Sequence, residues 1–315
     1  MTEIAMRKAY GEALAAYGAV NPDVVVLDVD TSSSTLSGYF RDLYPQRFFN
    51  IGIAEPCMID VGVGFALEGY IPFVNGFSAL LALRAVEAIR TNVCYARTNV
   101  KIAASYAGLS DYKDGPTHHT IFDIAIFRAM PDMTLLVPAD GAEAAAFVPL
   151  MAEYDGPVTM RINRAATLPV HTPGGNLEIG KGIIRRPGKD VAIIACGSMV
   201  GRSMQTAEQL TAMGVDTRVV EIHTLKPLDE DLILQTAAEV GAIVTAEEHS
   251  IIGGLGSAVA ETIVGKGPVK FHRVGINDTF ARTAPDVDTL MDSFGLSVEE
   301  IVRSVQSLLE GAGEL

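Results

Sequence analysis

The sequence predicts an α/β protein of two consecutive domains, each a mostly parallel sheet flanked by helices. Short apolar runs alternate with longer amphipathic segments, a turn-rich stretch near residues 169–189 interrupts this pattern, and the alternation then restarts. With 49% hydrophobic residues among 315, the chain can build a large core. We expect a first domain of residues 1–172, a linker of residues 173–188 and a second domain of residues 189–315.

Each element of the first domain follows from this alternation. Short apolar runs predict strands at residues 24–27, 70–74, 100–104, 133–137 and 158–162. Amphipathic segments predict helices at residues 3–19, 55–67, 80–94 and 143–153. Polar loops follow the first and third strands, at residues 28–34 and up to about residue 120.

The second domain repeats the pattern. We expect strands at residues 191–195, 217–222 and 242–245, and helices at residues 199–213, 232–240, 287–293 and 298–310. The run Gly253-Gly-Leu-Gly256 lacks the GxGxxG spacing, so it predicts a strand-to-helix turn rather than a dinucleotide motif. Neither a GxxxxGK[ST] loop nor a GxSxG elbow occurs in the sequence.

Charge and cysteine content narrow the class of protein. A net charge of -14 argues against nucleic acid or an anionic membrane as the main partner. The three cysteines form no CxxC pair, which suits a reducing compartment. The first twenty residues do not resemble a signal peptide, and no apolar stretch reaches the ~18 residues of a membrane span. We therefore expect a cytoplasmic protein.

The first segment that suggests chemistry is Asn50-Ile-Gly-Ile-Ala-Glu55. A strand ends near a glycine and a helix begins at a carboxylate, and catalytic groups often lie at such turns in open α/β sheets. The alternative is that Glu55 only complements the partial positive charge of a helix N-terminus.

The second segment is a loop containing Asp111, Asp114, His118 and His119, turned by Gly115-Pro. A histidine here can move a proton or donate a hydrogen bond. Adjacent histidines rarely converge on one ion and no third ligand is near, so we expect no metal site in this chain. The alternative is a structural, helix-capping loop.

The third segment is Met160-Arg-Ile-Asn-Arg164, at the end of a predicted strand. Two arginines at the carboxyl edge of a sheet suit the capture of an anion. For a single arginine, a surface ion pair is the alternative.

Taken in order, these motifs resemble the C-terminal half of transketolase. Gly52-Ile-Ala-Glu55, Asp114-Gly-Pro-Thr-His118 and the run at residues 155–164 are similar to its pyrimidine-binding domain. The runs VVEIHTLKPLDEDLI and VTAEEHSIIGGLGSAVAE are similar to its C-terminal domain, and to the corresponding parts of deoxyxylulose-phosphate synthase and 2-oxoacid dehydrogenase beta subunits. The DGPTH run favours transketolase, and the resemblance covers essentially the whole chain.

The resemblance implies a thiamine diphosphate enzyme. Glu55 would bond a nitrogen of the aminopyrimidine ring and favour the imino tautomer, which takes the proton from the thiazolium carbon. Phe77 would line the pocket of that ring. Leu80 stands where a second, stacking phenylalanine is common in the family.

The resemblance also implies substrate-binding residues. Asp114 and His118 would bind hydroxyls around the transferred two-carbon unit, with His118 also catalytic, whereas His119 receives no role. Arg164 and Ser34 would bind a terminal phosphate. Tyr106 stands near where a phosphate-binding histidine is expected, which leaves the acceptor sugar and its terminal phosphate open.

A missing motif implies a partner. The family holds the diphosphate and Mg²⁺ with a Gly-Asp-Gly motif, and this sequence contains none. The expected partner is an N-terminal-half subunit that carries this motif and the Mg²⁺, with the thiamine diphosphate shared between the chains. We expect two copies of each subunit, with this chain also self-associating as a dimer.

Three functions remain open from the sequence. The leading interpretation is a transketolase subunit of pentose-phosphate-type metabolism, transferring a ketol unit from a ketose phosphate to an aldose phosphate. The second is a decarboxylating enzyme, either like deoxyxylulose-phosphate synthase or like a 2-oxoacid dehydrogenase beta subunit. The third is a scaffold subunit, which would need none of Glu55, Asp114, His118 and Arg164.

Overall fold

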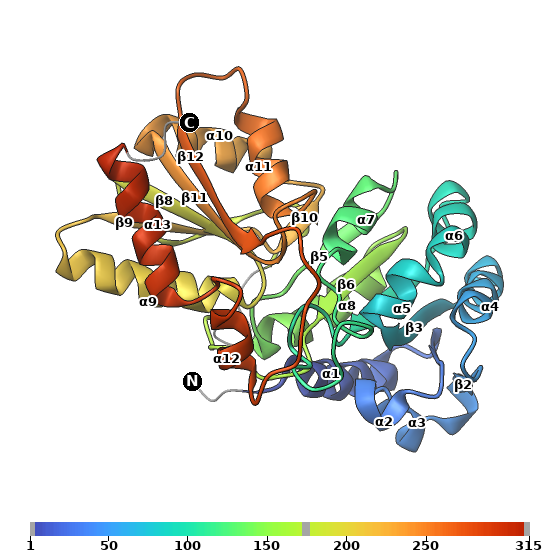
Figure 1. Cartoon of the computed structure of the whole chain (residues 1–315). Helices are drawn as coiled ribbons and strands as arrows, with labels where there is room; N and C mark the ends of the chain where they lie inside the picture. Colours follow the sequence, from blue (N-terminus) through green and yellow to red (C-terminus); the bar gives the residue numbers. More distant parts are fainter. Residues whose placement is uncertain (1–3, 172–176, 312–315) are drawn as a thin grey trace.

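The computed structural model describes residues 4–171 and 177–311, which form two sheets flanked by helices (Figure 1). This architecture confirms the predicted α/β class. The expected domain boundary at residues 172–173 lies outside the described residues, as does the start of the helix expected at residue 3.

The first sheet has the strand order β10-β5-β6-β4-β3-β1-β2, in which β1 to β6 pair in parallel. Parallel strands place their carboxyl ends at one edge, so the loops that follow them share that edge. Six of its strands come from the first half of the chain: β1 (Val24–Asp28), β2 (Phe48–Asn50), β3 (Ile71–Phe77), β4 (Lys101–Ser105), β5 (Thr134–Leu136) and β6 (Val158–Ile162).

Helices cover both faces of this sheet. They are α1 (Met6–Val20), α2 (Ser32–Thr35), α3 (Gly38–Leu43), α4 (Glu55–Leu67), α5 (Ser78–Leu83), α6 (Val86–Ala88), a π-helix (Ile89–Tyr95), α7 (Asp123–Ala129) and α8 (Gly141–Glu153), with a 3-10 turn at Pro45–Arg47. Successive strand residues point to opposite faces. In β1, Val24 and Val26 pack in a core with α1 and α8, whereas Val25 and Leu27 join a core with α4, α5 and α7.

The second sheet has the order β12-β11-β8-β9-β7, parallel except for β7. Its strands are β7 (Ile183–Arg186), β8 (Val191–Ala195), β9 (Thr217–Glu221), β11 (Ala242–Ser250) and β12 (Lys270–Ile276). The helices of this half are α9 (Met199–Ala212), α10 (Glu230–Val240), α11 (Leu255–Ile263), α12 (Val287–Asp292) and α13 (Val298–Glu310). Residues of α9 and α13 pack on one face of β8, and residues of α10 and α11 on the other.

The two halves of the chain are joined by a shared sheet and a shared core. β10 (Thr224–Lys226) belongs to the second half of the sequence but pairs antiparallel with β5 of the first sheet. One buried core contains residues of both sheets, including Leu27 from β1 and Ile194 from β8. The second half therefore holds the edge of the first sheet in place.

Three local expectations differ from the structure. Within the expected linker, Ile183–Arg186 forms β7 and pairs with β9, because the flanking turn residues hide a four-residue edge strand. The helix expected at residues 80–94 is broken at Ala85 (φ -97°, ψ 4°) and continues in π form. The loop expected at residues 28–34 contains the start of α2, because the Asp28 carboxylate accepts hydrogen bonds from Thr31 and Thr35. Among the described residues, no helix has both the length and the apolar character needed to cross a membrane.

Candidate active site

The residues singled out in the sequence follow the carboxyl ends of neighbouring strands. Ser34 comes after β1, Glu55 after β2, Tyr106 after β4 and Arg164 after β6, while Phe77 is the last residue of β3. Because these strands are parallel, the five residues lie along one edge of the first sheet, the usual position of a binding site in an open α/β sheet.

Glu55 is the first residue of α4 and is 1% exposed. Its Oε2 lies 3.3 Å from Nη1 of Arg84, which directly follows α5 and whose side chain is 54% exposed. The other oxygen, Oε1, accepts no hydrogen bond from the described residues. Complementing the helix N-terminus thus explains part of this placement, and one oxygen of the Glu55 carboxylate is left for a ligand.

A cluster of aromatic rings and guanidinium groups forms the next part of the edge. The Phe77 and Tyr106 ring centroids lie 4.4 Å apart, and the His118 ring meets Phe77 edge-on at 6.0 Å. Cζ of Arg164 lies 5.5 Å from the centroid of the Tyr106 ring. The structure therefore brings four of the expected residues together. Among the described contacts, no hydrogen bond or ion pair joins Glu55 to this cluster.

Arg7, on α1, completes the cluster and was not expected from the sequence. Its Nη1 donates to the Ser34 carbonyl at 2.7 Å and lies 3.3 Å from the Tyr106 hydroxyl. Its Cζ is 5.7 Å from the Tyr106 ring, so Arg7 and Arg164 both approach this ring. The ion pairs found among the described residues do not include Arg7. We call Arg7, Ser34, Tyr106 and Arg164 the anion subsite.

Asp111 borders the anion subsite. Its Oδ1 lies 3.6 Å from Nε of Arg164, and the residue is 2% exposed. Burial and the neighbouring Asp114 raise the pKa of the Asp111 carboxyl to about 6. Asp114 itself is exposed in the same loop. The sequence placed Asp111 in a polar loop, but its contact with Arg164 depends on tertiary structure.

The two adjacent histidines have different environments. His118 is partly exposed, and its Nδ1 lies 3.0 Å from the Thr117 hydroxyl. His119 is buried, and its Nε2 donates to the backbone carbonyl of Asp111. Burial lowers the pKa of His119. His119 therefore supports the loop, whereas His118 faces the aromatic cluster. Leu80 is partly buried on α5, one turn before Arg84.

The second half of the chain positions these loops through Glu248 on β11. Its Oε1 accepts a hydrogen bond from the Leu109 N–H at 2.5 Å, and its Oε2 accepts one from Nδ2 of Asn163 at 2.8 Å. Ser198 also donates to Oε2. Because Asn163 precedes Arg164, a single buried carboxylate ties the loop after β4 to the end of β6.

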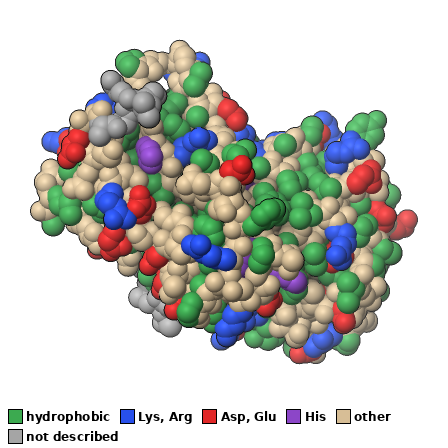
Figure 2. All heavy atoms as spheres, in the orientation of Figure 1, with side chains coloured by type: hydrophobic (Ala, Val, Ile, Leu, Met, Phe, Trp, Pro, Cys, Tyr) green, Lys and Arg blue, Asp and Glu red, His purple; other side chains and the backbone are tan. Residues whose placement is uncertain are grey.

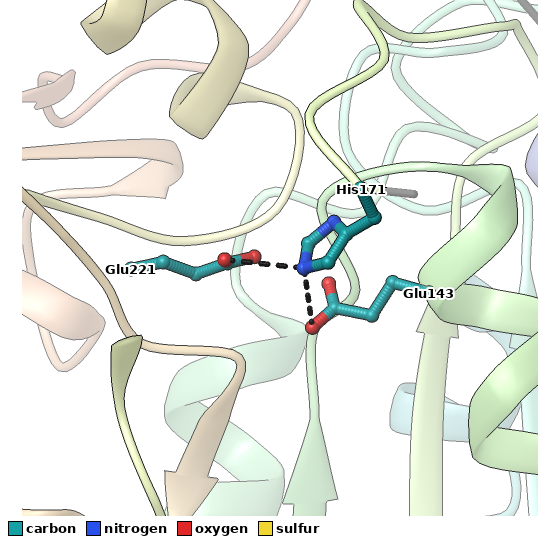
Figure 3. Close-up of side chains that lie close together, drawn as sticks. All are labelled: Glu143, His171 and Glu221. Atoms are coloured by element: carbon teal, nitrogen blue, oxygen red, sulfur yellow. Dashed lines mark ion pairs between the residues drawn. The ribbon is translucent and has the colours of Figure 1, made fainter. Parts of the chain in front are cut away.

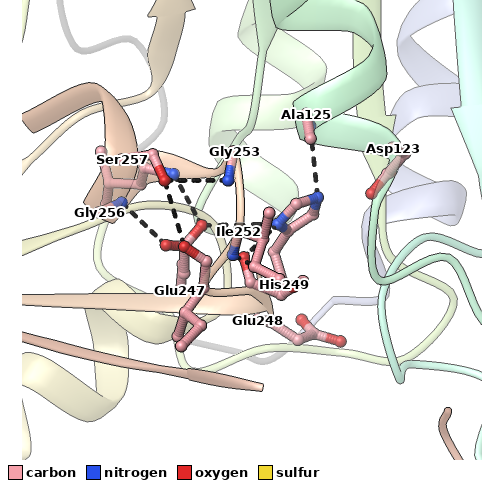
Figure 4. Close-up of polar contacts among 12 residues, drawn as sticks. Asp123, Ala125, Glu247, Glu248, His249, Ile252, Gly253, Gly256 and Ser257 are labelled. Atoms are coloured by element: carbon pink, nitrogen blue, oxygen red, sulfur yellow. Dashed lines mark hydrogen bonds and ion pairs between the residues drawn. The ribbon is translucent and has the colours of Figure 1, made fainter. Parts of the chain in front are cut away.

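Neighbouring residues of β11 hold the junction between the halves (Figure 4). Nε2 of His249 accepts a hydrogen bond from the Ala125 N–H at 3.3 Å, which links β11 to α7. Glu247 accepts hydrogen bonds from the N–H groups of Leu255 and Gly256 at the start of α11. A side chain at Gly254 would collide with this carboxylate. The glycine-rich run is thus a strand-to-helix turn, as the sequence predicts.

A separate buried cluster lies where the halves meet (Figure 3). Nε2 of His171 lies 3.4 Å from Oε1 of Glu143 and 3.3 Å from Oε2 of Glu221. These ligand atoms are close enough together to hold a metal ion. However, the guanidinium of Arg185 contacts both His171 and Glu221 and already supplies a cation there. We interpret the cluster as a structural ion network, and the absence of a metal site in this chain stays a prediction.

Comparison with known proteins decides the family. Residues 2–168 match the transketolase pyrimidine binding domain, and residues 180–301 match the transketolase C-terminal domain. A Methanocaldococcus jannaschii protein described as a transketolase C-terminal section is 41% identical over 303 residues, which cover 95% of each chain. The chain belongs to the transketolase family. The resemblance to the C-terminal half of transketolase is thereby confirmed.

The chain covers nearly all of some transketolase relatives and about half of others. The 6-deoxy-6-sulfo-D-fructose transketolase subunit of Clostridium sp. strain MSTE9 is 36% identical over 305 residues, covering 97% of this chain and 94% of that subunit. A solved structure described as a split gene transketolase, in an inactive β4 tetramer, matches with a TM-score of 0.90 and 42% identity over 98% of this chain and 99% of that one. Leishmania mexicana transketolase shares the fold, with a TM-score of 0.81 at 23% identity, and this chain covers 47% of it.

Proposed function

We propose that this chain is the pyrimidine-binding subunit of a thiamine-diphosphate-dependent transketolase. The enzyme moves a two-carbon ketol unit from a ketose phosphate to an aldose phosphate. One observation carries the proposal: a buried carboxylate with a free oxygen, Glu55, lies at the same sheet edge as a subsite built from two guanidinium groups.

The residues present fit the pyrimidine end of the cofactor. When bound, thiamine diphosphate supplies the nucleophilic carbon and the electron sink. The free oxygen of Glu55 is a suitable acceptor for a protonated ring nitrogen, and Arg84 pairs with the other oxygen and orients the carboxyl. Phe77 provides an aromatic wall, while Leu80 offers a smaller apolar contact than a second ring would.

The substrate residues divide into two groups. His118 lies beside Phe77. In our proposal it donates a hydrogen bond to an oxygen of the two-carbon unit and moves a proton there, and Asp114 accepts hydrogen bonds from sugar hydroxyls. Arg7 and Arg164 bind an anionic terminus, because guanidinium groups form charge-assisted hydrogen bonds with phosphate. Tyr106 packs against both guanidiniums and sets their spacing.

We propose that a separate subunit holds the diphosphate and Mg²⁺. The sequence has no Gly-Asp-Gly motif, and the chain matches two relatives nearly from end to end. Exposed apolar side chains near Glu55 and on α4 to the π-helix also offer a surface for subunit contacts: Ile53, Leu67, Leu83 and Tyr95. Figure 2 shows hydrophobic side chains gathered on the half that contains these elements. The expected assembly has two copies of each chain.

The competing function is decarboxylating. The deoxyxylulose-phosphate synthase 1 of Geobacter sulfurreducens is 34% identical over 309 residues, and this chain spans 48% of that protein. The test gives the assembled enzyme a ketose phosphate and an aldose phosphate, and in a parallel reaction a 2-oxoacid with the same aldose phosphate. Ketol transfer yields a new ketose and a shortened aldose in equal amounts, without CO₂. Release of CO₂ from a 2-oxoacid substrate, with no ketose exchange, would move the function to the synthase type.

A further inference from the structure

The feature that the proposed mechanism does not use is Asp111, a carboxylate that borders the anion subsite. Its Oδ1 lies 3.6 Å from Nε of Arg164. Its Oδ2 is buried and has no hydrogen-bond partner among the described residues. A carboxylate at this position opposes the binding of any anion to the same guanidinium group.

Several charged groups face Asp111 from the surrounding elements. Arg164 approaches from the end of β6 and Arg7 from α1, and both stabilise the ionised carboxylate. Asp114, in the same loop, opposes it, and His119 bonds only its backbone carbonyl. With both aspartates ionised, two negative charges balance the two guanidinium charges, so the subsite carries no excess positive charge for an anion.

We propose that Asp111 determines the terminal-group specificity of the subsite, because its carboxylate must take up a proton before an anionic sugar terminus can bind to Arg164. A neutral terminus binds without this proton. The step consumes one proton from solvent, which adds to the Asp111 carboxylate, and no other bond changes. The inference rests on the proposed function, since it assumes that Arg7 and Arg164 hold the end of the sugar.

The titration of Asp111 supports this coupling. Its pKa is already raised to about 6 by burial and by Asp114. A bound anion adds a further negative charge near the carboxyl and raises its pKa further. Binding of an anionic terminus near pH 7 therefore draws a proton from solution.

The rival role for Asp111 is positioning. A carboxylate beside an arginine can simply aim the guanidinium at its ligand and stay ionised. The two roles predict opposite signs for Asp111→Asn. Loss of an aiming group weakens anion binding at every pH, whereas loss of an opposing charge strengthens it near neutral pH.

The experiment measures proton uptake by titration calorimetry in buffers that differ in ionisation enthalpy. The protein is this chain assembled with its diphosphate-binding subunit, thiamine diphosphate and Mg²⁺. The probe is a ketose with a terminal sulfonate, which does not titrate in this range, and the comparison ligand is the same ketose with a terminal hydroxyl. We expect uptake approaching one proton per site for the sulfonate at pH 7 and none for the neutral ketose.

Two variants complete the test. Asp111→Asn abolishes the uptake and binds the sulfonate about 30-fold more tightly at pH 7.5, because a carboxyl with a pKa of about 6 is protonated in only roughly 3% of molecules at that pH. Asp132→Asn, which removes an exposed carboxylate paired with Arg97 before β5, behaves as the wild type. Proton uptake that persists in Asp111→Asn, or weaker sulfonate binding by that variant, overturns the proposal.

The wild-type comparison stands on its own even if Asp111→Asn does not fold. Equal proton uptake for the sulfonate and the neutral ketose contradicts the inference without any variant. Failure of the proposed function has a different signature. In that case the assembly transfers no ketol unit from either ketose, whether or not ligand binding takes up protons. Ketol transfer without proton uptake removes the inference alone.

Discussion

Replacing Glu55 with Gln tests the most important residue assignment in this chain. Gln has nearly the same shape as Glu, so it still accepts a hydrogen bond from Arg84 and still fills the start of α4. What it loses is the negative charge that, in our proposal, binds the aminopyrimidine ring and favours its imino tautomer. A group with a proton-transfer role contributes about 10²- to 10⁴-fold to the rate. We expect kcat of the assembled enzyme to fall by that factor, or about 3–5 kcal/mol of transition-state stabilisation.

The structure predicts that this loss is not caused by unfolding. The Arg84 side chain is 54% exposed, so solvent screens its ion pair with Glu55 and the pair stabilises the fold by about 0–1 kcal/mol. Removing a buried charge also removes its desolvation cost. The Tm of Glu55→Gln should therefore stay close to that of the wild type.

The assay is steady-state ketol transfer by the assembled enzyme, with Tm and subunit assembly measured on the same preparations. Glu68→Gln, just beyond the other end of α4, is the matched control and should keep wild-type kcat. If Glu55→Gln assembles normally and retains more than a small fraction of the activity, the assignment of Glu55 to the cofactor is wrong.

Three further predictions test the subsite and the junction. Arg164→Gln should raise KM for a phosphorylated ketose by roughly ten-fold or more, with little effect on an unphosphorylated one, since a charge-assisted bond contributes about 1.5–3 kcal/mol; equal effects on both substrates would argue against a phosphate role. Arg185→Met should lower the free energy of unfolding by about 3–5 kcal/mol, because Glu221 stays buried and loses the guanidinium that pairs with it; an unchanged Tm in thermal unfolding would contradict this. Burial lowers the pKa of His223 to about 4 from 6.5. The folded state therefore binds fewer protons than the unfolded state between these pH values, and the free energy of unfolding falls by up to about 3 kcal/mol as pH falls from 6.5 to 4. In His223→Gln, denaturant unfolding should show a smaller fall of this free energy over the same pH range.

The sequence predicted the interior strands well, because each is a short, mainly apolar run buried on both faces. β6 and β8 coincide with the predicted ranges, and both consist of buried residues. β12 was missed because its first half is a partly exposed edge with charged Lys270 and Arg273. β10 has only three residues, and its pairing with β5 is set by tertiary contact.

The residues of the candidate site also divide into those that a local sequence motif predicts and those that depend on tertiary contacts. Glu55 could be found because its local motif, a strand end followed by a helix start, has a structural meaning by itself. Arg7 could not, since it meets Ser34 and Tyr106 across 27 and 99 positions of sequence. Glu248 reaches Leu109 across 139 positions. Local sequence patterns do not predict which loops the fold brings to one edge of a sheet. Arg7 and Glu248 could therefore be assigned to the candidate site only from the structure.

The central claim is that this chain needs a second subunit to act. The decisive measurement is ketol transfer from xylulose 5-phosphate to ribose 5-phosphate with thiamine diphosphate and Mg²⁺. It compares this chain alone with the chain mixed with a candidate subunit that carries Gly-Asp-Gly. We predict activity only in the mixture, because this sequence has no such motif to bind the diphosphate. Activity of the chain alone would contradict the account.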